Sequence, residues 1–181
     1  MNSYQRTALI LGVVFTLVTL NSFVLAQDQR RRVLLRDHQK YRRAILRGLQ
    51  GCRVVVENLE PEIERDGLTR EQLQTDTELK FRMAGIKVLS LKEATQVKGS
   101  SPFFHLWVRV LKLQSGCYTY VITAELIEVV FPKRKPHYPI VVSTCEIPSF
   151  MGFTCRLTDI RQPAKDIVDQ FINDYLAVNP K

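Results

Sequence analysis

The side chains best suited to covalent chemistry are three histidines and four cysteines. His38, His105 and His137 fall in an expected helix, an expected strand and an expected loop. A Cys–His dyad is one nucleophilic arrangement that these residues suggest, with the thiol of Cys145 or Cys155 activated by the imidazole of His105. Neither a nucleophile-elbow motif nor a glycine-rich phosphate loop accompanies them. We therefore expect structural or exposed histidines and no enzyme activity.

Metal and cofactor sites are not expected from the remaining polar residues. The acidic run Glu57–Asp66, read as ENLEPEIERD, lacks the spacing of the oxygen ligands in a calcium-binding loop. Such a run of carboxylates is typical of a solvated loop. The cysteines are too far apart in the sequence to match a zinc-ribbon or C-x-x-C pattern. The sequence therefore predicts no catalytic residue, no metal ligand and no cofactor.

The cysteines are Cys52, Cys117, Cys145 and Cys155. An even number suits an oxidising compartment, where disulfides persist. Three arrangements are open from the sequence. The thiols are all free and buried, or Cys145 bonds to Cys155, which is its nearest neighbour in the sequence, or Cys117 bonds to Cys155 across the strands of an antiparallel meander.

An apolar run stands near the start of the sequence. Residues 7–26 carry no charge and follow a single arginine, as in a secretory signal peptide. Val24 and Ala26 are the small residues expected before a cut between Ala26 and Gln27, so we expect cleavage there and export to the periplasm. The alternative is an uncleaved membrane anchor, because about 20 apolar residues can span a bilayer. The three arginines at 30–32 would then tend to hold the rest of the chain in the cytoplasm.

The positive charge is confined to one segment. The 181-residue chain has a formal net charge of +8. Residues 27–53 hold nine Arg or Lys and two Asp, whereas residues 54–181 hold sixteen basic and sixteen acidic residues. The expected body is therefore neutral, which argues against nucleic-acid binding. We accordingly divide the chain into a signal peptide at 1–26, a basic helical segment at 27–51 and one domain at 52–181.

The basic segment predicts an amphipathic helix over residues 30–49. Apolar or partly apolar side chains recur there at steps of three and four, so they share one face. They are Leu34, His38, Tyr41, Ile45 and Leu49. The basic side chains lie elsewhere on the helix, and four of them are candidate interaction residues: Arg36, Lys40, Arg43 and Arg47. Either this helix lies on an anionic membrane, or, as we favour, its apolar stripe docks on the body.

The first part of the body predicts a β-α-β unit. The valine-rich stretch 52–58 is typical of a central strand. Thr69 and Gln72 match a capping box that begins a helix, and Gly85 is suited to end that helix. Residues 86–89 would then form a second strand, parallel to the first because a helix connects the two.

The second part of the body predicts an antiparallel meander after a short helical turn near residues 91–95. The expected strands cover residues 103–113, 118–130 and 140–147, and an extension of the last one toward residue 154 stays open. Ser115 and Gly116 mark a tight turn between the first two. In the middle strand alternate residues are apolar, as in a strand with one buried face.

The chain is expected to close with a helix. Thr158 or Asp159 would cap this helix, and Pro163 fits its first turn. One apolar stripe follows at helical spacing. Its members are Ile160, Ala164, Ile167, Val168, Phe171, Ile172, Tyr175 and Leu176. The sequence therefore predicts an α+β fold, in which a mixed sheet is covered mainly on one side by helices.

Three places on the body are candidate docking sites. Trp107 beside Arg109 would serve as an interface anchor if its face of the sheet is uncovered. The loop at 132–139 is basic and rich in proline, and Lys133, Arg134 and Lys135 would contact anionic lipid headgroups or an acidic protein. The edge strand of the sheet is the third place. The sequence does not rank these three.

The element order and three segments carry a resemblance to known proteins. The segments are RVVVENL, LTREQLQTDTELKFRMAGIKVLS and DIVDQFINDYLAVNP. They resemble the small α+β envelope domain of the Tol-system protein TolB and of the curli-secretion protein CsgG. Residues 48–181 also resemble small uncharacterised bacterial exported proteins. The chain lacks the lipobox and the pore-forming insertions of CsgG-like proteins.

The resemblance implies a non-catalytic envelope protein that binds or scaffolds other proteins. The partners expected on this basis are unidentified envelope proteins, with an anionic membrane surface and a second copy of the chain as further candidates. An envelope protein that binds a small ligand or a lipid is the alternative function. A membrane-anchored module is a second alternative, which applies if residues 7–26 are not removed.

Overall fold

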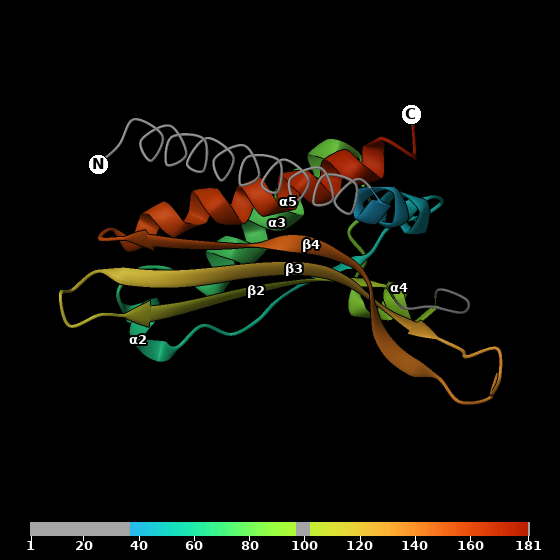
Figure 1. Cartoon of the computed structure of the whole chain (residues 1–181), viewed down its shortest axis with the longest axis horizontal. Helices are drawn as coiled ribbons and strands as arrows, with labels where there is room; N and C mark the ends of the chain where they lie inside the picture. Colours follow the sequence, from blue (N-terminus) through green and yellow to red (C-terminus); the bar gives the residue numbers. More distant parts are fainter. Residues whose placement is uncertain (1–36, 97–101, 181) are drawn as a thin grey trace, which may run out of the picture. The chain divides into compact units, whose positions relative to one another are not determined.

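The computed structural model describes residues 37–96 and 102–180 (Figure 1). The chain divides into two compact units, residues 1–41 and 42–181, and all the described strands belong to the second unit. The predicted signal peptide lies outside the described residues. Within the described ranges, we find no helix with the length and apolarity needed to cross a bilayer.

A four-stranded mixed sheet forms the centre of the fold. The strands are β1 (Arg53–Val56), β2 (Phe103–Lys112), β3 (Tyr118–Val130) and β4 (Ile140–Thr154), in the spatial order β1-β2-β3-β4. The pair β1 and β2 is parallel, whereas β3 is antiparallel to both β2 and β4. This arrangement confirms the predicted mixed sheet with an antiparallel meander. The last strand extends to residue 154, a point that the sequence left open.

The strand predicted at residues 86–89 is wrong, because β2 is the parallel partner of β1. Residues 86–89 lie between Gly85, which ends α3, and Ser90, whose hydroxyl accepts a hydrogen bond from the Glu93 amide in the next helix. Only one parallel bridge forms there, between Cys52 and Val88. The backbone approach beside it is close, since a Cβ atom at Gly51 would lie 2.4 Å from a neighbouring carbonyl oxygen.

The helices are α2 (Pro61–Arg65), α3 (Arg70–Ala84), α4 (Leu91–Gln96) and α5 (Arg161–Leu176), with a 3-10 turn η1 (Leu157–Ile160) before α5. The capping box at the start of α3 is confirmed, and Gly85 ends this helix at φ 81°. The short turn α4 is also confirmed. Helix α2 was not predicted, although Pro61 at its first turn is a usual sign of a helix start.

The core lies between one face of the sheet and the helices α3 and α5. Alternate residues of the strands point toward the helices, as predicted for β3. Phe104 of β2 contacts Phe81 of α3 and Phe171 of α5, with ring centroids 5.0 and 4.8 Å away. These three rings are fully buried. They fix both long helices over the same face of the sheet.

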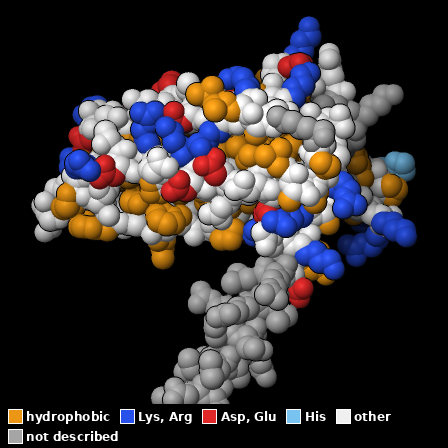
Figure 2. Space-filling model, turned by 90° about the horizontal axis from the view of Figure 1, so that it is seen from above, with side chains coloured by type: hydrophobic (Ala, Val, Ile, Leu, Met, Phe, Trp, Pro, Cys, Tyr) orange, Lys and Arg blue, Asp and Glu red, His pale blue; other side chains and the backbone are white. Residues whose placement is uncertain are grey.

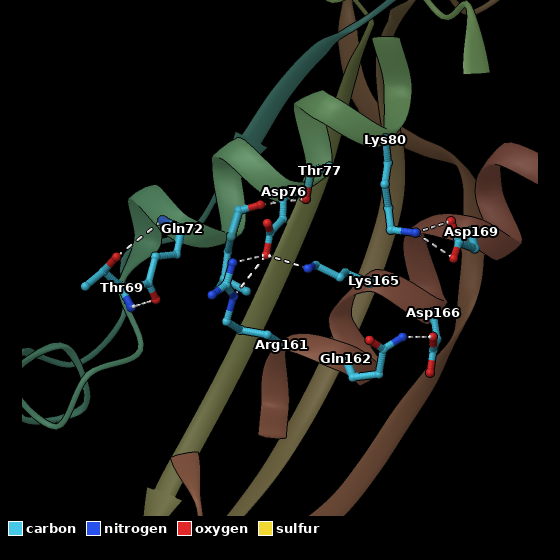
Figure 3. A network of polar contacts seen from close by, with 11 residues as sticks. Thr69, Gln72, Asp76, Thr77, Lys80, Arg161, Gln162, Lys165, Asp166 and Asp169 are labelled. Carbon is cyan, nitrogen blue, oxygen red and sulfur yellow. Dashed lines mark hydrogen bonds and ion pairs between the residues drawn. The ribbon is translucent and has the colours of Figure 1, made fainter. Parts of the chain in front are cut away.

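Polar contacts join α3 to α5 outside this core (Figure 3). The carboxylate of Asp76 accepts two hydrogen bonds from the guanidinium of Arg161, at 2.7 and 3.0 Å. One turn further along, the ammonium of Lys80 lies 2.7 Å from both carboxylate oxygens of Asp169. These pairs set the alignment of the two helices, although partly exposed pairs contribute little stability each.

The predicted cap of the closing helix is wrong. No side chain caps α5, because η1 leads directly into it. The carboxylate of Asp159 instead accepts hydrogen bonds from the hydroxyl of Thr154 and the guanidinium of Arg156, so it holds the corner between β4 and η1. The predicted apolar stripe of this helix is buried except at its end, where Tyr175 is half-buried and Leu176 is exposed.

The described part of the basic segment differs from the prediction. Residues 37–46 are helical, but of the predicted stripe, His38, Tyr41 and Ile45 are exposed and Leu49 is half-buried. The buried residue is Leu46. Beside it, the guanidinium groups of Arg42 and Arg43 donate hydrogen bonds of 3.0 and 2.9 Å to the two carboxylate oxygens of Asp174. An ion pair therefore takes the place expected for an apolar face.

A disulfide joins Cys117 to Cys155, as one of the three sequence alternatives predicts. It links the turn before β3 to the residue after β4. The alternative bridge between Cys145 and Cys155 is wrong, because Cys145 points into the core. Cys52 and Cys145 are free thiols, and burial raises the pKa of each to about 12.

The edge of the sheet at β1 is covered, and the edge at β4 is irregular. The outer backbone of β1 is covered by α3, because the Gln74 side chain bonds the Val56 amide and the Val54 carbonyl and the Arg70 guanidinium bonds the Val56 carbonyl. On the other side, the pairing of β4 with β3 is interrupted by two register shifts. Pro148 lies in the first and has no N–H to donate.

Replacing Asp174, which is 2 % exposed, by Asn should destabilise the protein by about 1–3 kcal/mol, because two arginines lose their counter-charge. Urea denaturation measures this change. The control is Asp169→Asn, where the carboxylate is half-exposed and the loss should stay below about 1 kcal/mol. Equal losses for the two variants would show that the buried pair does not anchor the basic segment.

Reducing the disulfide should lower the free energy of unfolding by about 4 kcal/mol, because the bridge closes a loop with a sequence separation of 38. The measurement is urea denaturation with and without a thiol reductant. A double variant, Cys117→Ser with Cys155→Ser, should match the reduced protein and should not respond to reductant. A reductant response in that variant would assign the effect to another thiol.

Candidate functional site

The face of the sheet opposite α3 and α5 carries an exposed apolar patch. Leu111 of β2 and Met151 and Phe153 of β4 are 63 %, 76 % and 64 % exposed. Strand pairing brings them together, because Leu111, Thr119 and Phe153 lie opposite one another in register. Figure 2 shows hydrophobic side chains gathered at the left-hand end of the molecule, where Figure 1 places the ends of β2 and β4.

Trp107 and Arg109 extend this patch along β2. Their side chains point to the same face, because they are two residues apart on a strand. The guanidinium carbon of Arg109 lies 3.7 Å from the centre of the Trp107 ring, which is a cation–π contact. Arg109 is exposed and Trp107 is half-buried. We call these five residues the sheet-face patch: Trp107, Arg109, Leu111, Met151 and Phe153.

His105 stands beside the sheet-face patch, between two carboxylates. Its Nε2 atom lies 3.1 Å from Oε2 of Glu57, and its Nδ1 atom lies 3.4 Å from Oε1 of Glu125. The alternative Cys–His dyad, which the sequence suggested but did not favour, does not form. Cys145 points to the helix-covered face of the sheet, and Cys155 is in the disulfide. The two carboxylates orient the imidazole, and neither cysteine serves it as a nucleophile.

A cleft of about 490 Å³ lies next to Trp107, where β1 has ended and β2 continues. Its walls are the 57–60 loop, Ile63 of α2 and residues 107–110 of β2. Near this cleft, the Asp66 carboxylate accepts hydrogen bonds from the Lys112 ammonium and the Tyr118 hydroxyl, which hold the pKa of Asp66 below its usual value. These bonds tie the end of α2 to the sheet beside the sheet-face patch.

A second cleft, of about 660 Å³, lies at the opposite end of β1, between the turn after Arg47 and α4. Lys87, Glu93 and Glu128 are among its polar lining residues. Glu93 accepts hydrogen bonds from the Ser90 amide and hydroxyl and pairs with Lys87, so its pKa falls to about 2. In the described ranges, no His, Cys, Asp and Glu side chains are grouped to hold a metal ion.

The basic candidate residues of the loop between β3 and β4 lie away from the sheet-face patch. Lys133, Arg134 and Lys135 are exposed on the loop between β3 and β4. Of the four on the basic segment, Lys40 and Arg47 are exposed, Arg43 pairs with Asp174, and Arg36 lies outside the described residues.

The sequence pointed to Trp107 and Arg109 as members of one site and offered no reason to add Met151 and Phe153.

The sequence holds only weak evidence that Met151 and Phe153 belong to a strand and to this site. Met151 and Phe153 alternate with Gly152 at the end of β4, but a proline precedes them, and the strand expected from the sequence covers residues 140–147 with its extension toward residue 154 left open. No protein-family model matches the chain, and a search of curated proteins finds no relative.

Replacing Glu93 by Gln should make the stability of the protein depend less on pH between about 4.5 and 2. A carboxylate with a lowered pKa stabilises the folded state above its usual value of 4.5, and this stability is lost as the pH falls toward about 2. We expect the melting temperatures of variant and wild type to differ at pH 6 and to converge near pH 2. Glu60→Gln, an exposed carboxylate, is the control, and an equal effect there would refute the assignment.

Proposed function

We propose that the protein is an exported, non-catalytic module of the bacterial cell envelope, which binds another protein through the sheet-face patch. The single observation that carries this proposal is the exposure of Leu111, Met151 and Phe153 on the sheet face that the described helices leave open. Contiguous apolar patches on soluble proteins usually mark interaction sites.

The composition of the sheet-face patch suits a protein partner. Trp and Arg are the residue types most enriched among those that dominate binding energy, and Phe and Met are enriched in interfaces generally. The stacking of Arg109 on Trp107 holds both side chains in place before a partner arrives, which lowers the entropic cost of binding. The expected partner surface is apolar, with a carboxylate placed to meet Arg109.

The absence of catalysis is supported by the separation of the reactive groups. His105 lies between two carboxylates on one face of the sheet, and the free thiols Cys52 and Cys145 lie buried on the other side. Export is supported by the apolar run before Ala26 and by the Cys117–Cys155 disulfide, which is compatible with an oxidising compartment.

Photo-crosslinking in a bacterial host tests this function. A photoreactive residue at Leu111 or Met151 should give a covalent adduct with a discrete partner, and one at Gln170, which is exposed on α5, should not. Trp107→Ala should reduce the yield at Met151 at least ten-fold, because truncating an interface anchor costs more than about 1.4 kcal/mol. Adducts of equal yield at all three positions would refute a dedicated site.

Two further readings complete the experiment. The melting temperature of Trp107→Ala must show that the variant is folded. The adduct mass separates a second copy of this chain from a different protein, and the absence of any adduct would leave a small ligand as the function to test. Cell fractionation should find the protein in the periplasm with Gln27 at its N-terminus. An intact N-terminus in the membrane fraction would contradict the proposed compartment.

A further inference from the structure

The outer part of the β3–β4 hairpin projects beyond the rest of the sheet. The pairing of β2 with β3 ends at Phe103 opposite Ile127. The pairing of β3 with β4 continues to Val130 opposite Ile140, so this part of the hairpin is two-stranded. Its side chains therefore lack a neighbouring strand, and it is the most prominent extension of the sheet in Figure 1.

The projecting hairpin, residues 128–142, is mainly basic. It contains three Lys or Arg and one His against a single acidic residue, Glu128, which lies at its base and accepts a hydrogen bond from the Thr144 hydroxyl. The basic residues Lys133, Arg134 and Lys135 are exposed. Among the described residues none of the three forms an ion pair with a carboxylate. Because residues 54–181 are neutral as a whole, the hairpin is a local positive tip.

Exposed apolar side chains surround these charges. They are Phe131, Tyr138, Ile140 and Val141. The ammonium of Lys135 lies 5.8 Å from the centre of the Tyr138 ring. Figure 2 shows Lys, Arg and His side chains together with hydrophobic ones at its right-hand end, where Figure 1 places the hairpin. A surface that combines basic and exposed aromatic side chains matches an anionic lipid interface, which offers charged headgroups above an apolar layer.

The backbone of the tip is held in a defined conformation by turns and prolines. Two successive turns close it, through hydrogen bonds from the Lys135 amide to the Pro132 carbonyl and from the Tyr138 amide to the Lys135 carbonyl, at 2.8 and 3.1 Å. Prolines at 132, 136 and 139 fix further backbone angles. Ordering this loop on a surface therefore costs little entropy.

We propose that the tip of the β3–β4 hairpin binds the surface of a membrane that contains anionic phospholipids, with Lys133, Arg134 and Lys135 at the headgroups and Phe131 and Tyr138 at the apolar boundary. This inference goes beyond the proposed function and does not depend on it. The sheet-face patch lies toward the opposite end of β3 and stays free for its partner when the hairpin is on the membrane.

The test measures contact at the hairpin itself, so that other parts of the full chain do not dominate the signal. Tyr138→Trp places a tryptophan at the tip, and Gln114→Trp places one in the turn at the other end of β3. The wild type, whose single tryptophan is Trp107, is the reference. Vesicles of phosphatidylglycerol and phosphatidylcholine should shift the emission of the tryptophan introduced at the tip to the blue, and brominated lipids should quench it. The tryptophan introduced in the turn should show no such change.

Neutralising the three basic residues of the tip measures how much they contribute to membrane binding. Each basic residue at an anionic surface strengthens binding about five-fold, so Lys133→Gln, Arg134→Gln and Lys135→Gln together should raise the half-saturating lipid concentration on the order of 100-fold. Lys92→Gln, an exposed lysine on α4, should change it less than about two-fold. Equal signals with pure phosphatidylcholine, or no effect of the triple substitution, would overturn the proposal. An equal blue shift with poly-glutamate and no lipid quenching would overturn it in favour of an acidic protein.

Discussion

The contact of Phe104 with Phe81 and Phe171 is the interaction on which the rest of the structure depends. It joins the start of β2 to both long helices, so that α3 and α5 cover the same face of the sheet. Because side chains alternate along a strand, every residue that faces these rings has a neighbour that faces away from them. The described helices bury one face, and the other keeps Trp107 and its neighbours accessible. One-sided packing is thus the physical origin of the candidate site.

Local patterns predicted local structure well and long-range contacts poorly. The Thr69–Gln72 capping box and the alternation along β3 involve residues close in sequence, so their outcome follows from short-range rules. The partner of β1 depends on which distant segment completes the sheet, and no local signal separates residues 86–89 from residues 103–112 in this respect. The same limit explains why Asp174 was unremarkable in the sequence, since its partners lie more than 130 residues away. At the candidate site, Trp107 and Arg109 were identifiable from one strand, whereas Met151 and Phe153 join them only through pairing.

The condition of the sheet edges favours binding at the open face of the sheet over binding at an edge strand. An unpaired strand would accept another strand by backbone hydrogen bonds, and this protein covers the edge at β1 and makes the edge at β4 irregular. Gln74 and Arg70 occupy the backbone groups of β1, and the register shifts and Pro148 break the regular pattern along β4. The third docking place considered from the sequence, an edge strand, is therefore the weakest of the three. Side-chain recognition is left as the main route, which favours a partner with a matching shape.

The disulfide lies at one end of β3 and the hairpin tip at the other, which gives a single strand two different mechanical environments. Near Tyr118, opening the ladder would require β2, β4 and the covalent link to separate together. Near Val130, only one neighbouring strand restrains the backbone. Amide hydrogen exchange should thus become faster from residue 118 to residue 130. The end of β3 near Tyr118, which lies beside the sheet-face patch, is therefore rigid, whereas the end near Val130 is flexible enough to adapt to an uneven surface.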